Sequence, residues 1–98
     1  MGNIFARRDG KSPDKAPVLS GSHLDTQPAG GRFDGILGVL GALETVRSLN
    51  DHGIETVSPV EIVVWTNEEG ARFAPSMMGS GVFAGIFEQD EILSLIHI

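Results

Sequence analysis

The segment Val60-Glu61-Ile62-Val63-Val64-Trp65-Thr66 decides how this chain folds. It is rich in β-branched residues and almost entirely apolar, which is typical of a central strand covered on both faces. Pro59 precedes it, and the polar, glycine-containing segment Asn67–Gly81 follows it as a loop. The sequence therefore predicts a sheet with this segment near its centre.

A helix is predicted over Gly35–Asn50, upstream of this strand. Apolar side chains recur there at helical spacing and form one wide stripe. The following turn, Asn50-Asp51-His52-Gly53, is a stop signal, with Gly53 in the left-handed conformation that caps many helices. We expect His52 to be a solvated residue of this cap. The stripe consists of Ile36, Val39, Leu40, Leu43, Val46 and Leu49.

A second strand, Val18–His23, precedes the helix. It begins apolar and becomes polar, as expected of a buried strand that reaches a site at its carboxyl end. The order strand, helix, strand favours a right-handed crossover between parallel strands. Gly2–Arg8 is predicted to be a further strand, and Val82–Ile92 a helix with exposed acidic side chains. The fold class is therefore α/β with a mostly parallel central sheet.

The composition excludes several classes of protein. The 98 residues have room for one domain, and without Cys there is no disulfide scaffold, Cys-based zinc finger or thiol nucleophile. With 7 basic and 13 acidic side chains, the chain lacks the basic footprint of nucleic-acid binding. We find neither an apolar run of about 18 residues, which a membrane span needs, nor a secretory signal. We therefore expect no nucleic-acid or membrane partner, with the cytoplasm as the default location.

Three polar clusters adjoin the predicted elements. They are Gly21–Thr26 after the first strand of the crossover, Gly30–Gly35 before the helix, and Thr66–Gly70 after the central strand. Ligands of α/β sheets bind beyond the carboxyl ends of parallel strands, so we expect these clusters to form one site. Together they offer one imidazole and several carboxylates, a ligand set suited to zinc, manganese or cobalt.

His23 and Asp34 each have two interpretations. A lone His is more often packed or solvated than a metal ligand. In extended backbone, however, Asp25 faces the same way as His23 and can hold one ring nitrogen while the other binds a metal. The alternative is that Asp25 only caps a turn. Asp34 is either the N-cap of the helix or a metal carboxylate, and the two roles are compatible.

The pair Glu68-Glu69 is the most informative feature. Adjacent carboxylates repel each other, and a solvated loop is their common setting. Here the pair directly follows the apolar strand, and Gly70 permits a sharp turn. One carboxylate can then bind a metal while its neighbour acts as a general base on water.

These clusters resemble one known family. The stretches Gly21-Ser22-His23-Leu24-Asp25-Thr26, Gly31-Arg32-Phe33-Asp34-Gly35 and Thr66-Asn67-Glu68-Glu69-Gly70-Ala71-Arg72-Phe73 resemble the hydantoinase/carbamoylase family of zinc-dependent amidases. Ala74–Ser80 continues the likeness, which covers nearly all of residues 2–92. The spacing agrees too, since Asp34 follows His23 by 11 positions and Glu69 follows Asp34 by 35.

The resemblance implies a role for each candidate residue. His23 would bind the first metal, Asp34 would bridge both metals, and Glu69 would bind the second. Glu68 would be the general base, and Asp25 would orient His23. Two zinc ions per subunit are implied, with manganese or cobalt as substitutes. A cis peptide bond after Asp34 and a homodimer formed through an inserted domain, which is absent here, are implied as well.

The expected function is hydrolysis of linear amide or ureido C–N bonds, foremost in N-carbamoyl-L-amino acids. Allantoate amidohydrolase, or an aminoacylase or dipeptidase of the wider clan, is the alternative within the enzyme class. A catalytically incompetent fragment is the other alternative. Residues 1–92 would be part of a zinc-peptidase-like catalytic domain, truncated at both ends and inactive alone, because two His ligands of relatives are absent.

The last six residues, Leu93–Ile98, have a separate explanation. This hexapeptide is what one reading frame of a common sequencing adapter encodes. We therefore expect residues 93–98 to be a non-native tail and assign His97 no functional role.

Overall fold

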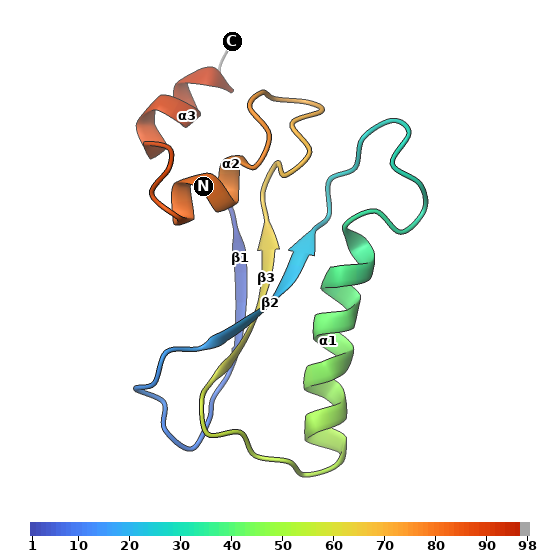
Figure 1. The fold of residues 1–98 in the computed structure, drawn as a ribbon, viewed down its shortest axis with the longest axis vertical. Coiled ribbons are helices and arrows are strands. Elements are labelled where there is room, and N and C mark those ends of the chain that lie inside the picture. Colours follow the sequence, from blue (N-terminus) through green and yellow to red (C-terminus); the bar gives the residue numbers. More distant parts are fainter. Residues whose placement is uncertain (97–98) are drawn as a thin grey trace.

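The computed structural model of the chain describes residues 1–96. Of the predicted non-native tail, residues 93–95 form the end of the last helix, whereas His97 and its neighbour lie outside the described residues. The elements in chain order are β1 (Ile4–Arg8), β2 (Val18–His23), α1 (Ile36–Asp51), β3 (Val60–Trp65), α2 (Met78–Phe83) and α3 (Gln89–Leu95) (Figure 1).

The three strands form one sheet in the order β1-β3-β2. β2 runs parallel to β3, with His23 opposite Trp65, whereas β1 runs antiparallel to β3, with Phe5 opposite Val63. The α/β class and the central position of β3 are confirmed. The described sheet is mixed rather than mostly parallel, because the short loop of residues 9–17 reverses the chain between β1 and β2 (Figure 1).

Helix α1 and a group of aromatic rings lie on opposite faces of this sheet. Gly38 of α1 packs on Ser22, which points to the same face as Val64. On the other face, the ring centroids of Phe5, Trp65 and Phe83 lie 5.2–5.9 Å apart.

Few side chains between these layers are fully buried. Val63 is 2% exposed, but the other residues of β3 are half-buried, so the expected cover on both faces is only partly present. The buried apolar residues are Ala42, Val63, Met78 and Ile92.

The predicted helix over 35–50 is confirmed within one residue at each end. Gly53 has φ 61°, and the Nδ1 atom of exposed His52 lies 2.8 Å from the Ser48 carbonyl oxygen, as expected of a solvated cap. The apolar stripe is only partly covered, however: Leu40 and Leu43 are 52% and 42% exposed, and its other members are half-buried. No helix of residues 1–96 is both long and apolar enough to cross a membrane.

The single helix predicted over residues 82–92 is wrong. The structure has α2 beginning within the segment that we expected to be loop, and then α3 after a break. Gly85, with φ 75°, reverses the backbone, and the amide of Ile86 donates to the carbonyl of Gly81 at 2.8 Å. This closed turn ends α2 and separates it from α3. Exposure of the acidic residues Glu88, Asp90 and Glu91 is confirmed.

Candidate metal centre

His23 lies at the carboxyl end of β2 and is 7% exposed. Its Nδ1 atom lies 2.7 Å from the backbone carbonyl oxygen of Asp25. A carbonyl oxygen only accepts, so Nδ1 carries the proton and donates. With Nδ1 protonated, Nε2 is the ring atom available to a metal.

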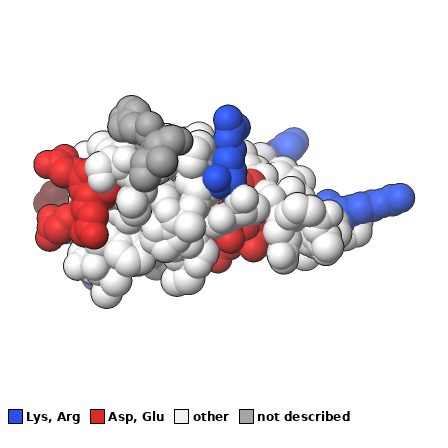
Figure 2. Space-filling model, turned by 90° about the horizontal axis from the view of Figure 1, so that it is seen from above, with Lys and Arg blue, Asp and Glu red and all other residues white. Residues whose placement is uncertain are grey.

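Three carboxylates surround this Nε2 atom. The distances are 3.4 Å to Glu68 Oε2, 3.9 Å to Asp34 Oδ1 and 4.0 Å to Glu69 Oε1. The ligand atoms of His23, Glu68 and Glu69 all lie within 4.8 Å of one another. Viewed from above (Figure 2), acidic side chains gather near the middle of this end, apart from a second group at one side. The three predicted clusters thus meet at one edge of the sheet.

Asp34 points into this cluster instead of capping α1. The N-cap position belongs to Gly35, and no side chain makes a capping hydrogen bond there. The Oδ2 atom of Asp34 is buried and has no hydrogen-bond partner. An orphaned buried carboxylate oxygen is costly, and a cation beside it would remove that cost.

The turn at Gly35 brings Asp34 against His23. Gly35 has φ 71°, and a Cβ atom there would overlap the carbonyl oxygen and imidazole ring of His23. The expected cis peptide bond after Asp34 is not present. The left-handed conformation of Gly35 makes the turn with a trans bond, and the cis bond of the described residues is Ala74–Pro75.

Asp25 holds two parts of the site with different atoms. Its carbonyl orients His23, while its carboxylate Oδ1 stays 3.6 Å from Nδ1. The carboxylate instead accepts the backbone N–H groups of Glu68 at 3.2 Å and Glu69 at 3.0 Å. We expected a contact between this carboxylate and the ring. The anchoring of the two glutamates was missed, because no local pattern reveals a bond across more than 40 residues.

The electrostatics of the cluster disfavour three free negative charges. A hydrogen bond shared with Asp34 raises the pKa of the Glu69 carboxyl above its usual value. Partial burial and the negative charges of Asp34 and Glu68 act in the same direction, while His23 opposes them. The carboxylates of the cluster therefore repel one another more strongly than His23 alone offsets.

The donors fit a divalent metal of the zinc type. Tetrahedral ligands about 2.1 Å from zinc lie roughly 3.4 Å from one another, close to the observed spacing around Nε2. One imidazole nitrogen with carboxylate oxygens is a borderline-to-hard donor set. Glu68, which we expected to stay off the metal, lies as near to Nε2 as the residues expected to bind it.

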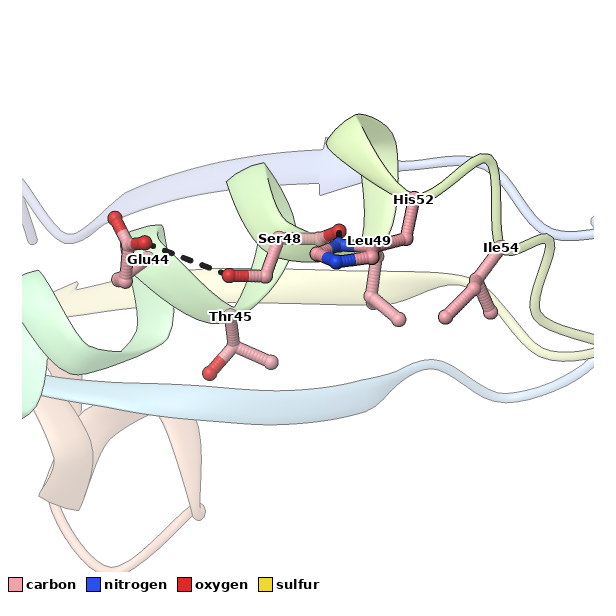
Figure 3. Close-up of a pocket in the computed structure, with 6 residues that line it drawn as sticks. All are labelled: Glu44, Thr45, Ser48, Leu49, His52 and Ile54. Carbon is pink, nitrogen blue, oxygen red and sulfur yellow. Dashed lines mark hydrogen bonds between the residues drawn. The ribbon is translucent and has the colours of Figure 1, made fainter.

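A groove of about 450 Å³ lies at the other end of α1. Its lining includes the aliphatic Leu49 and Ile54, and Ser48 donates to Glu44 at 3.4 Å across its wall (Figure 3). None of its residues belongs to the acidic cluster around His23. The groove is lined by Glu44, Thr45, Ser48, Leu49, His52 and Ile54.

Comparison with known proteins identifies relatives for nearly the whole chain. Residues 19–98 match Peptidase family M20/M25/M40. An N-carbamoyl-L-amino-acid amidohydrolase of Rhizobium meliloti is 63% identical over 86 residues, which cover 88% of this chain and 21% of that protein. A ureidoglycolate hydrolase of Arabidopsis thaliana is 42% identical over 93 residues, which cover 95% of this chain and 20% of that protein.

A solved structure agrees with these relatives. The hydantoinase/carbamoylase family amidase of Burkholderia vietnamiensis superposes with a TM-score of 0.92 at 67% identity. The match covers 96% of this chain and 23% of that one. The chain thus spans about a fifth of the length of the relatives it matches.

Proposed function

This chain belongs to Peptidase family M20/M25/M40, and from that premise we propose that the whole protein is a metal-dependent hydrolase of linear C–N bonds. N-carbamoyl-L-amino acids are the favoured substrates, because the 63% identical relative is named an amidohydrolase of these compounds. The observation that carries the proposal is the meeting of His23 Nε2 with three carboxylates at the carboxyl edge of the sheet.

In the proposed site, His23, Asp34 and Glu69 would hold the metal. A bound divalent metal supplies a polarised water nucleophile and a positive charge for the oxygen of the scissile group. Glu68 accepts the proton of the attacking water and returns it to the leaving nitrogen. Asp25 keeps the proton of His23 on Nδ1, so Nε2 stays available. A ureido substrate would give an amino acid, ammonia and carbon dioxide.

Zinc is the metal we propose, with manganese or cobalt as substitutes. Support comes from the imidazole of His23 with the carboxylates of Asp34 and Glu69 beside it, and from the buried Asp34 Oδ2 atom, which has no hydrogen-bond partner. Among residues 1–96, only His23 brings an imidazole to this site, since His52 lies at the far end of α1. We therefore expect the 98-residue chain to bind metal without turning over substrate.

A different ureido acid is the second candidate substrate. The observation that favours it is the 42% identity to a ureidoglycolate hydrolase over 95% of this chain. An allantoate deiminase of Glycine max, 40% identical over 88 residues, keeps that substrate open as well. Both compounds would be attacked at a ureido carbon, so the residue roles do not change. Ammonia release from each compound by the full-length protein would discriminate them.

Zinc titration of the 98-residue chain by calorimetry tests the metal site. We expect saturable binding that His23→Asn weakens at least tenfold, because it removes the only ring nitrogen in the cluster. His52→Asn is the matched control, and it should bind zinc like the unmodified chain. Absence of binding, or equal binding by the His23 variant, would contradict the proposed centre.

A further inference from the structure

The backbone turns sharply at Asn67, two residues after β3 ends at Trp65. Asn67 has φ 50°, one of two left-handed non-glycine residues in the part of the chain that the structure describes. Asn tolerates this conformation better than most residues, although it still costs free energy relative to the extended form. Such outliers persist where the surroundings hold them in place.

This turn explains how two adjacent glutamates reach one imidazole. In an extended strand, successive side chains point to opposite faces, so continuation of β3 would separate Glu68 from Glu69. Instead, both have a carboxylate oxygen within 4.0 Å of His23 Nε2. The change of direction at Asn67 is the step that makes this possible.

The side chain of Asn67 holds the turn from inside the loop. Its Nδ2 group donates to the carbonyl oxygens of Phe73 at 2.6 Å and Pro75 at 3.2 Å. The backbone carbonyl oxygen of Asn67 accepts the backbone N–H of Met78 at 3.3 Å, at the start of α2. Asn67 therefore connects the end of β3 to both the middle and the end of the loop.

The backbones of Glu68 and Glu69 are held by hydrogen bonds. The Glu68 carbonyl oxygen accepts the amide of Met77 at 2.7 Å. The amides of Glu68 and Glu69 donate to the Asp25 carboxylate. These bonds are formed together with the left-handed turn at residue 67.

We propose that Asn67 is a positioning residue that aims Glu68 and Glu69 at His23. It does so through its left-handed backbone and its two side-chain hydrogen bonds. Two measurements test this inference. One of them, zinc affinity, rests on the proposed metal site. The other readout, the hydrogen bonds of the Glu68 and Glu69 amides, does not depend on any metal.

Three variants of the 98-residue chain separate the two contributions. Asn67→Ala loses both the tolerance for positive φ and the hydrogen bonds, whereas Asn67→Gly keeps the backbone freedom and loses only the bonds. Asn3→Ala is the matched control. Asn3 also ties this loop, since its side chain bonds to the Gly79 carbonyl oxygen at 3.0 Å and the Thr66 amide at 2.9 Å. It does not set the turn at residue 67.

Amide hydrogen exchange of the metal-free chain is the first measurement. We expect exchange at Glu68 and Glu69 to accelerate at least tenfold in Asn67→Ala, by less in Asn67→Gly, and to stay near the unmodified rate in Asn3→Ala. Equal acceleration in the Asn67 and Asn3 variants would mean that Asn67 only stabilises the loop, and would overturn the proposal. Unchanged rates in Asn67→Ala would overturn it as well.

Zinc titration of the same variants is the second measurement. Affinity should fall at least tenfold in Asn67→Ala and remain near normal in Asn3→Ala. If the unmodified chain binds no zinc, the proposed function fails, and the exchange rates still decide the role of Asn67. If the unmodified chain binds zinc and Asn67→Ala binds it equally well, the positioning role is overturned while the metal site stands.

Discussion

The two ends of helix α1 differ in how closely the chain packs around them. At the first end, Gly35 leaves no room for a Cβ atom beside His23, and the Asp25 carboxylate accepts the backbone N–H groups of Glu68 and Glu69. At the other end, Gly53 has nothing within 4 Å of where a Cβ atom would lie, and a groove of about 450 Å³ adjoins the helix. The polar edge is thus more closely packed and more hydrogen-bonded than the other end of α1, although the apolar core of the molecule is small.

The largest difference between the two ends should appear in catalysis. We predict that Glu68→Gln in the full-length protein lowers kcat by about 10² to 10⁴, because it removes the group that accepts the proton. Metal content should stay near normal in this variant. Glu44→Gln, in the groove at the other end of α1, is the control and should keep normal turnover. Normal turnover by Glu68→Gln would remove Glu68 from its proposed role.

The next largest effect is expected on zinc affinity when Gly35 and Gly53, at the two ends of α1, are each replaced by alanine. Both have positive φ, so alanine at either position strains the backbone by about 1 kcal/mol. At Gly35 the added Cβ atom also displaces His23, so Gly35→Ala should weaken zinc binding by about 100-fold, of the order seen when the surroundings of a metal ligand are disturbed. Gly53→Ala should lower the melting temperature without changing zinc affinity. Calorimetry with thermal unfolding measures both, and equal zinc affinity of the two variants would break the comparison.

A smaller effect is expected at Asp25. Asp25→Asn keeps the carbonyl that holds His23 but replaces one carboxylate oxygen with a donor, so one of the two amide bonds to Glu68 and Glu69 is lost. Zinc affinity should fall by about tenfold, the lower end of the range for residues that orient metal ligands. Asp9→Asn, an exposed partner of Arg7, should have no effect on zinc affinity. If Asp25→Asn bound zinc normally, the amide bonds would not matter to the site.

The smallest effect concerns pH. Because the pKa of Glu69 is raised, a proton must leave this carboxyl before it can bind a metal. Zinc affinity should therefore rise by a few-fold as the pH increases above the usual value of 4.5, and binding should release a proton. Calorimetry in buffers of different ionisation enthalpy measures that release. Glu69→Gln should bind zinc more weakly and release fewer protons, and an unchanged proton count would contradict this assignment.

Most of the fold could be predicted because its signals are local. The β-branched run of β3 and the helical periodicity before it placed two elements within one residue. The break between α2 and α3 was missed, because it depends on a turn that returns to Gly81. The antiparallel pairing of β1 could not be predicted, since nothing in Gly2–Arg8 indicates which neighbour it takes.

The members of the candidate site were predicted, but their connections were not. Residue types and strand ends brought His23, Asp34 and the two glutamates to one edge. The bonds from Asp25 to the Glu68 and Glu69 amides join residues far apart in sequence, so no local pattern indicates them. Asn67 had a signal, since Asn directly after a strand favours a left-handed turn. The metal, the residue roles, the dimer and the cytoplasmic location stay predictions.

Because Asp25 contacts both His23 and the loop, ordering of the loop and binding of a metal are thermodynamically coupled. The carbonyl of Asp25 holds His23 and its carboxylate holds the start of the loop, so whatever fixes one favours the other to the same extent. A metal at 100 times its dissociation constant would add about 2.7 kcal/mol to the stability of the folded chain. Part of this stabilisation would come from ordering residues 67–77. Removal of the metal by a chelator should therefore make this loop sensitive to proteases before the sheet unfolds.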